Sequence, residues 1–340
     1  MAPRAAIVGL SGPRLTAGER AYLKAADPLG IILFARNVET PDQVAGLVGE
    51  ARAALGRVAP VLIDQEGGRV QRLGPPHWRR YPPARRFEAI EKAAPAMGLE
   101  AARLGARLIA DDLQALGIDV DCLPLLDVPL QGAHDIIGDR AYGHEADSVS
   151  RFAAPVLEGL AEGGVLGVIK HLPGHGRAFT DSHEELPRVD APLEALKKSD
   201  FPPFRAFCDA PFAMTAHVVY EALDPDLPVT WSASALAYLR RELKLGAALM
   251  SDDLSMKALD GPMRQRAERA IAAGCDLALH CNGDAAEMDA VAEGTPHLEG
   301  EALARVDRAL TLRHAPAAFD RKRAERRFDA LLALAGGEGA

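Results

Sequence analysis

The sequence predicts an α/β protein built as a single (β/α)8 barrel of the TIM type, with C-terminal helices covering it. Short apolar runs alternate along the chain with longer segments of helical period, which is typical of repeated strand and helix units. There are eight such runs, the number that closes a barrel. Polar residues gather directly after the runs, where barrel enzymes build their active sites. An open, doubly wound sheet is the structural alternative.

The predicted strands are the apolar runs themselves. In chain order they are Ala5–Leu10, Gly30–Phe34, Val61–Ile63, Ile118–Cys122, Val165–Ile169, Phe212–Thr215, Ala247–Ser251 and Asp276–His280.

Helices are predicted between the runs from their start and stop signals. Thr40 and Pro41 suit the N-cap and first position of a helix that carries its apolar residues on one face and stops before Gly56. Three more helices are expected over residues 99–116 before Gly117, 232–243 with Ser232 as N-cap, and 267–273 before Gly274. The segment after residue 285 is expected to add the helical covering.

The chain shows no linker that would divide it, so residues 1–335 are expected to form one catalytic barrel domain. Residues 336–340 are expected to be a flexible tail.

Composition excludes several classes of protein. The 340 residues carry a formal net charge of −9, which disfavours a nucleic-acid partner because such partners require cationic neutralisation of phosphates. No apolar run approaches the roughly 18 residues of a membrane span, and the N-terminal apolar stretch is too short for a signal peptide. The four cysteines lack zinc-type spacing. We expect a cytoplasmic protein with reduced thiols and no membrane association.

Polar residues follow seven of the eight runs. They are Arg36 and Asn37; Asp64, Gln65, Glu66, Arg69 and Arg72; Asp127, Asp139 and Arg140; Lys170 and His171; His217; Asp252 and Asp253; and His280 and Asn282.

Several of these residues have structural interpretations. Asp127 is interpreted as a buried hydrogen-bonding carboxylate. Glu66, which precedes two glycines, fits turn chemistry, and surface ion pairs suit Arg36 and Arg69 as well as a functional role does. The three residues that could simply satisfy loop backbone are His217, His280 and Asn282.

The segment 170–187 is the strongest functional candidate, because a loop of this length in a compact barrel is usually functional. A zinc site on His171 and His175 is disfavoured, because Pro173 and Gly174 break the helix that would bring them together. No metal or other cofactor is therefore expected. Asp181 lies two residues from His183. An aspartate near a histidine can fix the tautomer of the ring and stabilise the imidazolium, so His183 is a candidate general acid and base.

Five segments together resemble glycoside hydrolase family 3, specifically the single-domain bacterial β-N-acetylglucosaminidases of peptidoglycan recycling. They occur in family order and are GIILFARN (30–37), DQEGGRVQRL (64–73), IGDRAYG (137–143), KHLPGHGRAFTDSH (170–183) and MSDDLSM (250–256). One departure is Leu172, where the family usually has Phe, and we expect it to alter only the packing at the root of the loop.

The resemblance implies a role for each matching residue. Asp252 corresponds to the family's nucleophile, with Asp253 in support, and His183 corresponds to its acid and base, partnered by Asp181. The residues that correspond to those holding the sugar hydroxyls are Asp64, Arg72, Arg140, Lys170 and His171.

The expected function is that of a retaining β-N-acetylhexosaminidase that acts through a covalent glycosyl-Asp252 intermediate. The resemblance implies a small-molecule muropeptide substrate, GlcNAc linked to 1,6-anhydro-N-acetylmuramic acid with or without its peptide. It also implies a monomer. Alternatives within the family are a β-N-acetylglucosaminide phosphorylase and another β-glycosidase. A substrate-assisted route, with the acetamido group as nucleophile, is a chemical alternative for N-acetyl sugars. Outside it stand a Schiff-base aldolase that uses Lys170 and a non-catalytic sugar-binding barrel.

Overall fold

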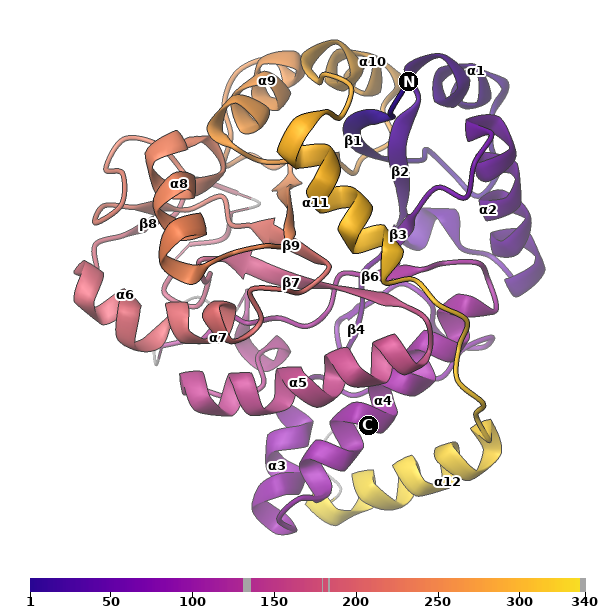
Figure 1. Cartoon of the computed structure of the whole chain (residues 1–340). Coiled ribbons are helices and arrows are strands. Elements are labelled where there is room, and N and C mark those ends of the chain that lie inside the picture. Colours follow the sequence, from indigo (N-terminus) through magenta and orange to yellow (C-terminus); the bar gives the residue numbers. More distant parts are fainter. Residues whose placement is uncertain (131–135, 179, 183, 337–340) are drawn as a thin grey trace.

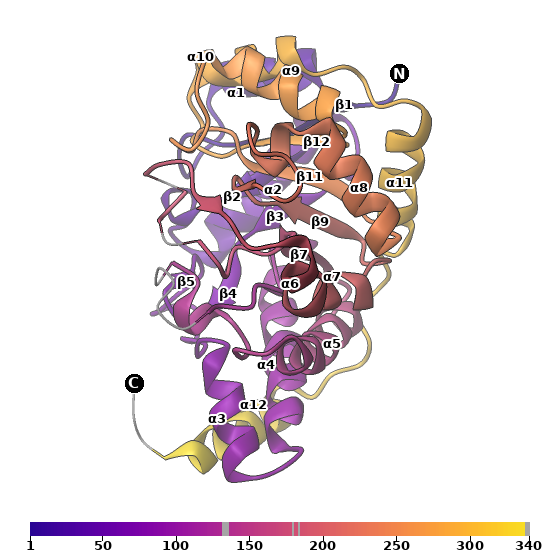
Figure 2. The ribbon, with the colours of Figure 1, turned by 90° about the vertical axis from the view of Figure 1, so that its left-hand side faces the viewer.

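The computed structural model describes residues 1–130, 136–178, 180–182 and 184–336. Within these residues, eight parallel strands close into a barrel in the order β1-β12-β11-β9-β7-β6-β3-β2 (Figures 1 and 2). The strands are β1 (Arg4–Gly9), β2 (Pro28–Leu33), β3 (Val61–Ile63), β6 (Val120–Asp121), β7 (Leu166–Leu172), β9 (Phe212–Thr215), β11 (Ala248–Asp253) and β12 (Leu277–His280). Because β1 pairs with both β12 and β2, the sheet has no edge, which excludes the open doubly wound alternative. The predicted barrel is confirmed.

All eight predicted runs coincide with barrel strands, and the differences lie at their ends. The fourth run shortens to the two residues of β6, whereas β7 continues three residues beyond its run, to Leu172. Lys170 and His171 therefore lie near the carboxyl end of strand β7 rather than on the loop that follows it. Leu172 is fully buried and packs in a hydrophobic cluster.

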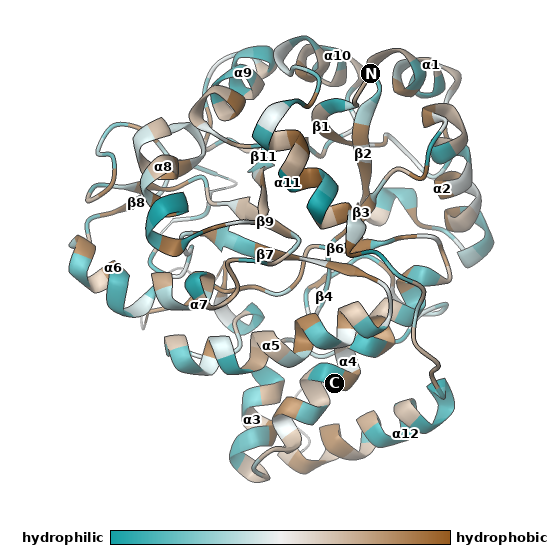
Figure 3. Cartoon of the chain, in the orientation of Figure 1, coloured by the Kyte–Doolittle hydropathy of each residue, from teal (hydrophilic) through white to brown (hydrophobic). Residues whose placement is uncertain are grey.

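Helices surround the strands and show hydrophobic residues on some faces and hydrophilic residues on others (Figure 3). They are α1 (Ala17–Ala26), α2 (Pro41–Leu55), α3 (Arg85–Ala93), α4 (Met97–Gln114), α5 (Ala146–Glu162), α6 (Leu193–Ser199), α7 (Phe201–Ala206), α8 (Ala233–Leu243), α9 (Met263–Ala273), α10 (Ala285–Gly294), α11 (Gly300–Thr311) and α12 (Arg321–Leu332). In the described part of the chain, no helix is long and apolar enough to cross a membrane.

The starts of α2 and α8 and the ends of α2 and α9 follow from capping chemistry as predicted. The helix expected over residues 99–116 instead spans Met97–Gln114, and the helix expected over residues 267–273 begins at Met263. Thr40 caps α2 by accepting a hydrogen bond from the backbone of Gln43, and Gly56 ends that helix in the left-handed conformation. Ser232 caps α8 in the same way, and Gly274 ends α9 with φ of 115°. These signals are local, so the sequence alone predicts them.

The C-terminal helices have two different positions. Leu298 and two residues of α11, Val306 and Ala309, join the hydrophobic cluster inside the barrel, so α11 closes its amino end. In contrast, α12 packs on α3 and α4, with Phe328 buried against Tyr81 and Phe87 (Figures 1 and 2). Of these two helices, α11 therefore covers the barrel, whereas α12 covers α3 and α4. The single-domain assignment of residues 1–335 stays a prediction, and residues 337–340 of the predicted tail lie outside the described residues.

Four short strands and a 3-10 turn lie at the carboxyl end of the barrel, opposite α11 (Figure 2). An antiparallel hairpin, β4 (Gln65–Gly67) with β5 (Val70–Gln71), follows β3. After β7, β8 (Arg188–Val189) pairs with β10 (Val219–Tyr220), which follows β9. A 3-10 turn, η2 (Gly138–Arg140), lies in the connection after β6. These pieces supply the walls of the site.

Candidate active site

A polar cavity of about 280 Å³ opens at the carboxyl end of the barrel. The side chains that line the cavity come from strand ends and from the short elements that follow them, so residues far apart in the sequence lie close together in it. The polar residues that line it are Asp64, Glu66, Arg69, Arg72, Arg140, Lys170, His171, His175, Ser182, Asp252 and Asp253. The sequence-predicted residues Asp64, Arg72, Arg140, Lys170, His171 and Asp252 are thus brought together.

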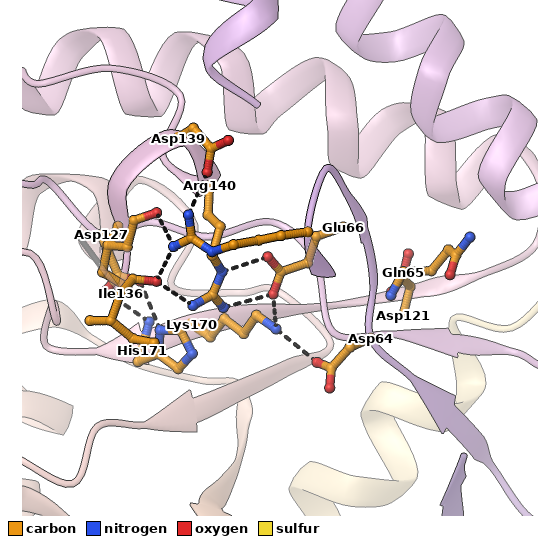
Figure 4. A network of polar contacts seen from close by, with 12 residues as sticks. Asp64, Gln65, Glu66, Asp121, Asp127, Ile136, Asp139, Arg140, Lys170 and His171 are labelled. Carbon is orange, nitrogen blue, oxygen red and sulfur yellow. Dashed lines mark hydrogen bonds and ion pairs between the residues drawn. The ribbon is translucent and has the colours of Figure 1, made fainter. Parts of the chain in front are cut away.

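A network of alternating charges forms one wall of the cavity. Lys170 Nζ lies 2.9 Å from Asp64 Oδ1 and 2.6 Å from Glu66 Oε1. Arg72 Nη2 donates to Asp64 Oδ2 at 3.0 Å. Arg140 donates two hydrogen bonds of 2.8 Å to the Glu66 carboxylate, from Nε and Nη2. Figure 4 shows the Arg140 and Lys170 cations both pointing toward the Glu66 carboxylate. Each charge has a partner, which lets this wall stay ionised despite its burial.

The pKa values of the network follow from this pairing. Burial raises the pKa of Asp64, but the charges of Lys170 and Arg72 outweigh it and hold that pKa well below its ordinary value. Burial lowers the pKa of Lys170, but Asp64 and Glu66 outweigh it and raise that pKa well above its ordinary value. The raised pKa favours the cationic form of Lys170. A Schiff-base lysine needs the opposite shift, so this geometry argues against the aldolase alternative.

Gln65 shapes the hairpin that carries these groups. Its Oε1 accepts the backbone N–H groups of Arg72 and Leu73, and its Nε2 donates to the Leu73 carbonyl. Its own N–H donates to Asp121 Oδ1 at 3.0 Å, and burial raises the pKa of Asp121 well above its ordinary value. At Gly67, φ is 94° and a Cβ would lie 2.4 Å from a backbone carbonyl, so only glycine suits the turn. The hairpin therefore folds back and sets Arg72 beside the strand end.

Asp127 orients two histidines from beneath the cavity. It is fully buried, and its Oδ2 lies 2.7 Å from His171 Nδ1. Its Oδ1 accepts the backbone N–H groups of His171 at 3.2 Å and His175 at 2.5 Å. Because an ionised carboxylate only accepts hydrogen bonds, His171 Nδ1 carries the proton and Nε2 remains for a ligand. The interpretation of Asp127 as a hydrogen-bonding carboxylate is confirmed, and it also acts as a positioning residue.

We expect Asp127 to make stability depend on pH in the acid range. Burial raises its pKa, but His171 and the hydrogen bonds outweigh burial and lower it to about 2. Since the folded-state pKa is depressed, this carboxylate stabilises the fold above about pH 4, and that contribution is lost as the pH falls toward 2. The ionised Asp127 carboxylate contributes about 2 kcal/mol to the free energy of unfolding near pH 7. Urea unfolding of the parent and of Asp127→Asn from pH 7 to pH 3 should show their difference shrinking. A difference that stays constant would contradict the assignment.

Asp252 and Asp253 end β11 at the cavity. The Asp253 backbone N–H donates to Asp252 Oδ1 at 2.8 Å. The Asp253 carboxylate accepts from Ser255 N at 3.0 Å, from Ser255 Oγ at 2.6 Å and from Cys281 N at 3.0 Å. Asp253 therefore ties the loops after β11 and β12 together, and both aspartates line the cavity that holds the charged wall.

The predicted acid and base pair is described only in part. His183 lies outside the described residues. Asp181 is half-buried, and its carbonyl accepts the backbone N–H groups of Glu184 and Glu185. Ser182, between the two, is buried and lines the cavity. The roles of Asp181 and His183 stay predictions.

Comparison with known proteins identifies the family. The model for the glycosyl hydrolase family 3 N-terminal domain matches residues 6–312. The chain belongs to glycosyl hydrolase family 3. It is 36% identical over 331 residues to a beta-hexosaminidase of Idiomarina loihiensis, a match that covers 94% of this chain and 96% of that relative. It is also 38% identical over 281 residues to a beta-hexosaminidase of Alkalilimnicola ehrlichii, with 81% and 80% covered.

Solved family 3 structures share the fold. NagZ from Neisseria gonorrhoeae, in complex with N-trifluoroacetyl-D-glucosamine, matches with a TM-score of 0.85 and 30% identity over 99% of this chain and 98% of its own. A family 3 beta-N-acetylglucosaminidase from Paenibacillus sp. str. FPU-7 matches with a TM-score of 0.80 and 29% identity over 99% of this chain and 62% of its own. The predicted family is confirmed, and the chain is a glycoside hydrolase of the beta-hexosaminidase type.

The remaining polar residues of this family 3 chain mostly support its loops. Arg36 donates to the carbonyls of Leu10 and Cys281 rather than to a surface carboxylate. His217 contacts Thr230 and the carbonyl of Asp253, as a loop-supporting residue would. The two remaining candidates of this kind, His280 and Asn282, both contact Glu287.

Glu66 is the residue whose importance to this family 3 site the sequence analysis missed. Its adjacent glycines suggested a turn, but the structure gives it the contact with both Lys170 and Arg140. The sequence did contain one signal that Glu66 lies in the site. In extended chain, residues two apart point to the same side, so Glu66 shares a side with Asp64.

Proposed function

We propose that this chain is a retaining β-N-acetylhexosaminidase that hydrolyses terminal β-linked N-acetylglucosamine. The observation that carries the proposal is that Asp252 lines the same cavity as the charged wall of Asp64, Arg72, Arg140 and Lys170. A sugar held by that wall would therefore lie within reach of a carboxylate, which is the arrangement that glycosyl transfer to an enzyme nucleophile requires.

The charged wall is suited to a neutral polyhydroxylated ring. Asp64 accepts hydrogen bonds while Lys170 and Arg72 donate them, so adjacent hydroxyls meet an acceptor and a donor held in fixed positions. His171, with Nδ1 bound to Asp127, offers Nε2 as a further contact. Because the wall is already ordered by its ion pairs, substrate binding has little side-chain entropy to remove.

In the first chemical step, a carboxylate oxygen of Asp252 attacks the anomeric carbon. The bond from that carbon to the aglycone oxygen breaks, and His183 gives its proton to the leaving oxygen. In the second step, His183 takes a proton from water, the water oxygen attacks the same carbon, and the ester bond to Asp252 breaks. Asp181 would stabilise the imidazolium. The two displacements restore the β configuration.

The substrate is proposed to be GlcNAc linked to 1,6-anhydro-N-acetylmuramic acid, alone or with its peptide, in cytoplasmic cell-wall recycling by a monomer. The family resemblance supports this assignment. The solved relatives add support for the sugar, since one holds N-trifluoroacetyl-D-glucosamine and another is named a beta-N-acetylglucosaminidase.

A panel of 4-nitrophenyl β-glycosides of N-acetylglucosamine, glucose and xylose tests the proposal. We expect kcat/KM for the N-acetylglucosaminide to exceed the others by roughly a hundredfold or more, since buried polar groups that lose a partner penalise the wrong sugar. Proton NMR of the first product should show the β anomer. A first-formed α anomer, or a preference for glucose, would overturn the proposal. Repeating the assay in phosphate buffer separates hydrolysis from phosphorolysis, in which sugar 1-phosphate would be the main product.

A further inference from the structure

Ser182 is buried in a stretch of loop whose described neighbours are more exposed. It is 2% exposed. Thr180 and Asp181 before it are half-buried, whereas Glu184 and Glu185 after it are exposed. A short polar side chain turned inward from such a loop normally has partners there.

Two contacts join Ser182 to different parts of the barrel. Its Oγ lies 3.0 Å from His175 Nε2, and the backbone N–H of His175 donates to Asp127 Oδ1. Its carbonyl accepts the N–H of Ala258 at 3.2 Å. Ala258 lies in the connection that leaves β11 after Asp252. Ser182 therefore links the loop after β7 to the loop after the proposed nucleophile.

The contact with His175 is well suited to holding a loop. The His175 side chain is buried, and burial together with the nearby His171 lowers its pKa to about 4, so the ring is neutral near pH 7. Within the described residues, its other ring nitrogen, Nδ1, has no hydrogen-bond partner. Loss of the Ser182 hydroxyl would thus leave a buried imidazole without this polar contact, which weakens the anchoring of the loop.

We propose that Ser182 is a positioning residue for proton transfer: its contacts with His175 and Ala258 anchor the loop to which the acid and base role is proposed. This role rests on the proposed function. It does not require Ser182 to touch the reacting atoms. Since a poor leaving group needs protonation and a good one does not, the role predicts an effect that depends on the aglycone.

The test compares Ser182→Ala with the parent on two β-N-acetylglucosaminides, one with an alkyl aglycone and one with a 2,4-dinitrophenyl aglycone. We expect kcat/KM to fall roughly tenfold or more on the alkyl glycoside, about what loss of one well-placed hydrogen bond produces. On the dinitrophenyl glycoside we expect a fall of about threefold or less, because that aglycone leaves unprotonated. Sodium azide should raise turnover of the dinitrophenyl substrate in the variant and yield a β-glycosyl azide.

Two matched variants exclude a general folding defect. Ser182→Thr keeps the hydroxyl and should retain most of the kcat/KM on the alkyl glycoside. Thr180→Ala removes a hydroxyl from the same loop and should leave kcat/KM unchanged on both substrates. Equal losses on both substrates, or no loss on either, would overturn this role and leave the proposed function standing. A parent protein inactive on every glycoside would instead overturn the proposed function, and this role with it.

Discussion

Replacing Asp252 by alanine is expected to lower kcat on 4-nitrophenyl β-N-acetylglucosaminide by roughly 10⁴-fold or more, the scale seen when a nucleophile is removed from a catalytic unit. The affinity for N-acetylglucosamine should change little, because the charged wall that would hold the ring is separate from this carboxylate. Isothermal titration with N-acetylglucosamine and steady-state kinetics measure the two effects independently.

The matched control is Asp260→Ala, which removes an aspartate from the same connection after β11. The Asp260 side chain is 89% exposed and pairs with Arg269 at 3.5 Å, so its loss should leave kcat within about twofold. Mass spectrometry after reaction with a fluorinated glycoside that slows the second step should place the label on Asp252. An unlabelled enzyme, or a variant that keeps a tenth of the activity, would point to the acetamido-assisted route.

The second large effect is expected from Lys170→Met. This change leaves the carboxylates of Asp64 and Glu66 close together without the cation between them, and breaking a buried ion pair from one side costs about 3–5 kcal/mol. Since Arg72 and Arg140 still pair with these carboxylates, the destabilisation should lie near 3 kcal/mol. Urea unfolding at pH 7 measures it, and KM for the N-acetylglucosaminide should rise in parallel.

The double variant Lys170→Met/Glu66→Gln tests the electrostatic cause. Removing one of the two stranded charges should restore part of the lost stability, whereas two independent packing defects would add. Lys198→Met, at an exposed position on α6, serves as the control and should change stability by less than about 0.5 kcal/mol. A loss below about 1 kcal/mol for Lys170→Met would show that the network contributes little to the fold.

Much of the fold was predictable because its signals are local. A strand buried on both faces must be a continuous apolar run, and each of the eight runs became a barrel strand. Helix ends depend on a side chain three residues away or on a positive φ, so Thr40, Ser232 and Gly274 marked them correctly. The grouping of polar residues followed as well, since parallel strands place their carboxyl ends at one edge.

The partners of the site residues were not predictable in the same way. Glu66 and Arg140 are 74 residues apart, and Lys170 and Asp64 are 106 apart. No local sequence signal around these residues predicts which cation pairs with which carboxylate. The same holds for Asp127, whose two histidines lie more than 40 residues along the chain. The position of α11 across the amino end also depends on which apolar faces remain uncovered once the barrel has closed.

The sequence by itself determined the barrel, the order of its elements and the set of polar residues at its carboxyl end, because backbone geometry and burial act over a few neighbouring residues. The tertiary structure alone decided how those residues pair, that Glu66 organises two of the cations, and that Ser182 bridges two loops. The physical reason is that ion pairs and hydrogen bonds are selected by distances across the closed barrel, and those distances exist only after every strand is in register.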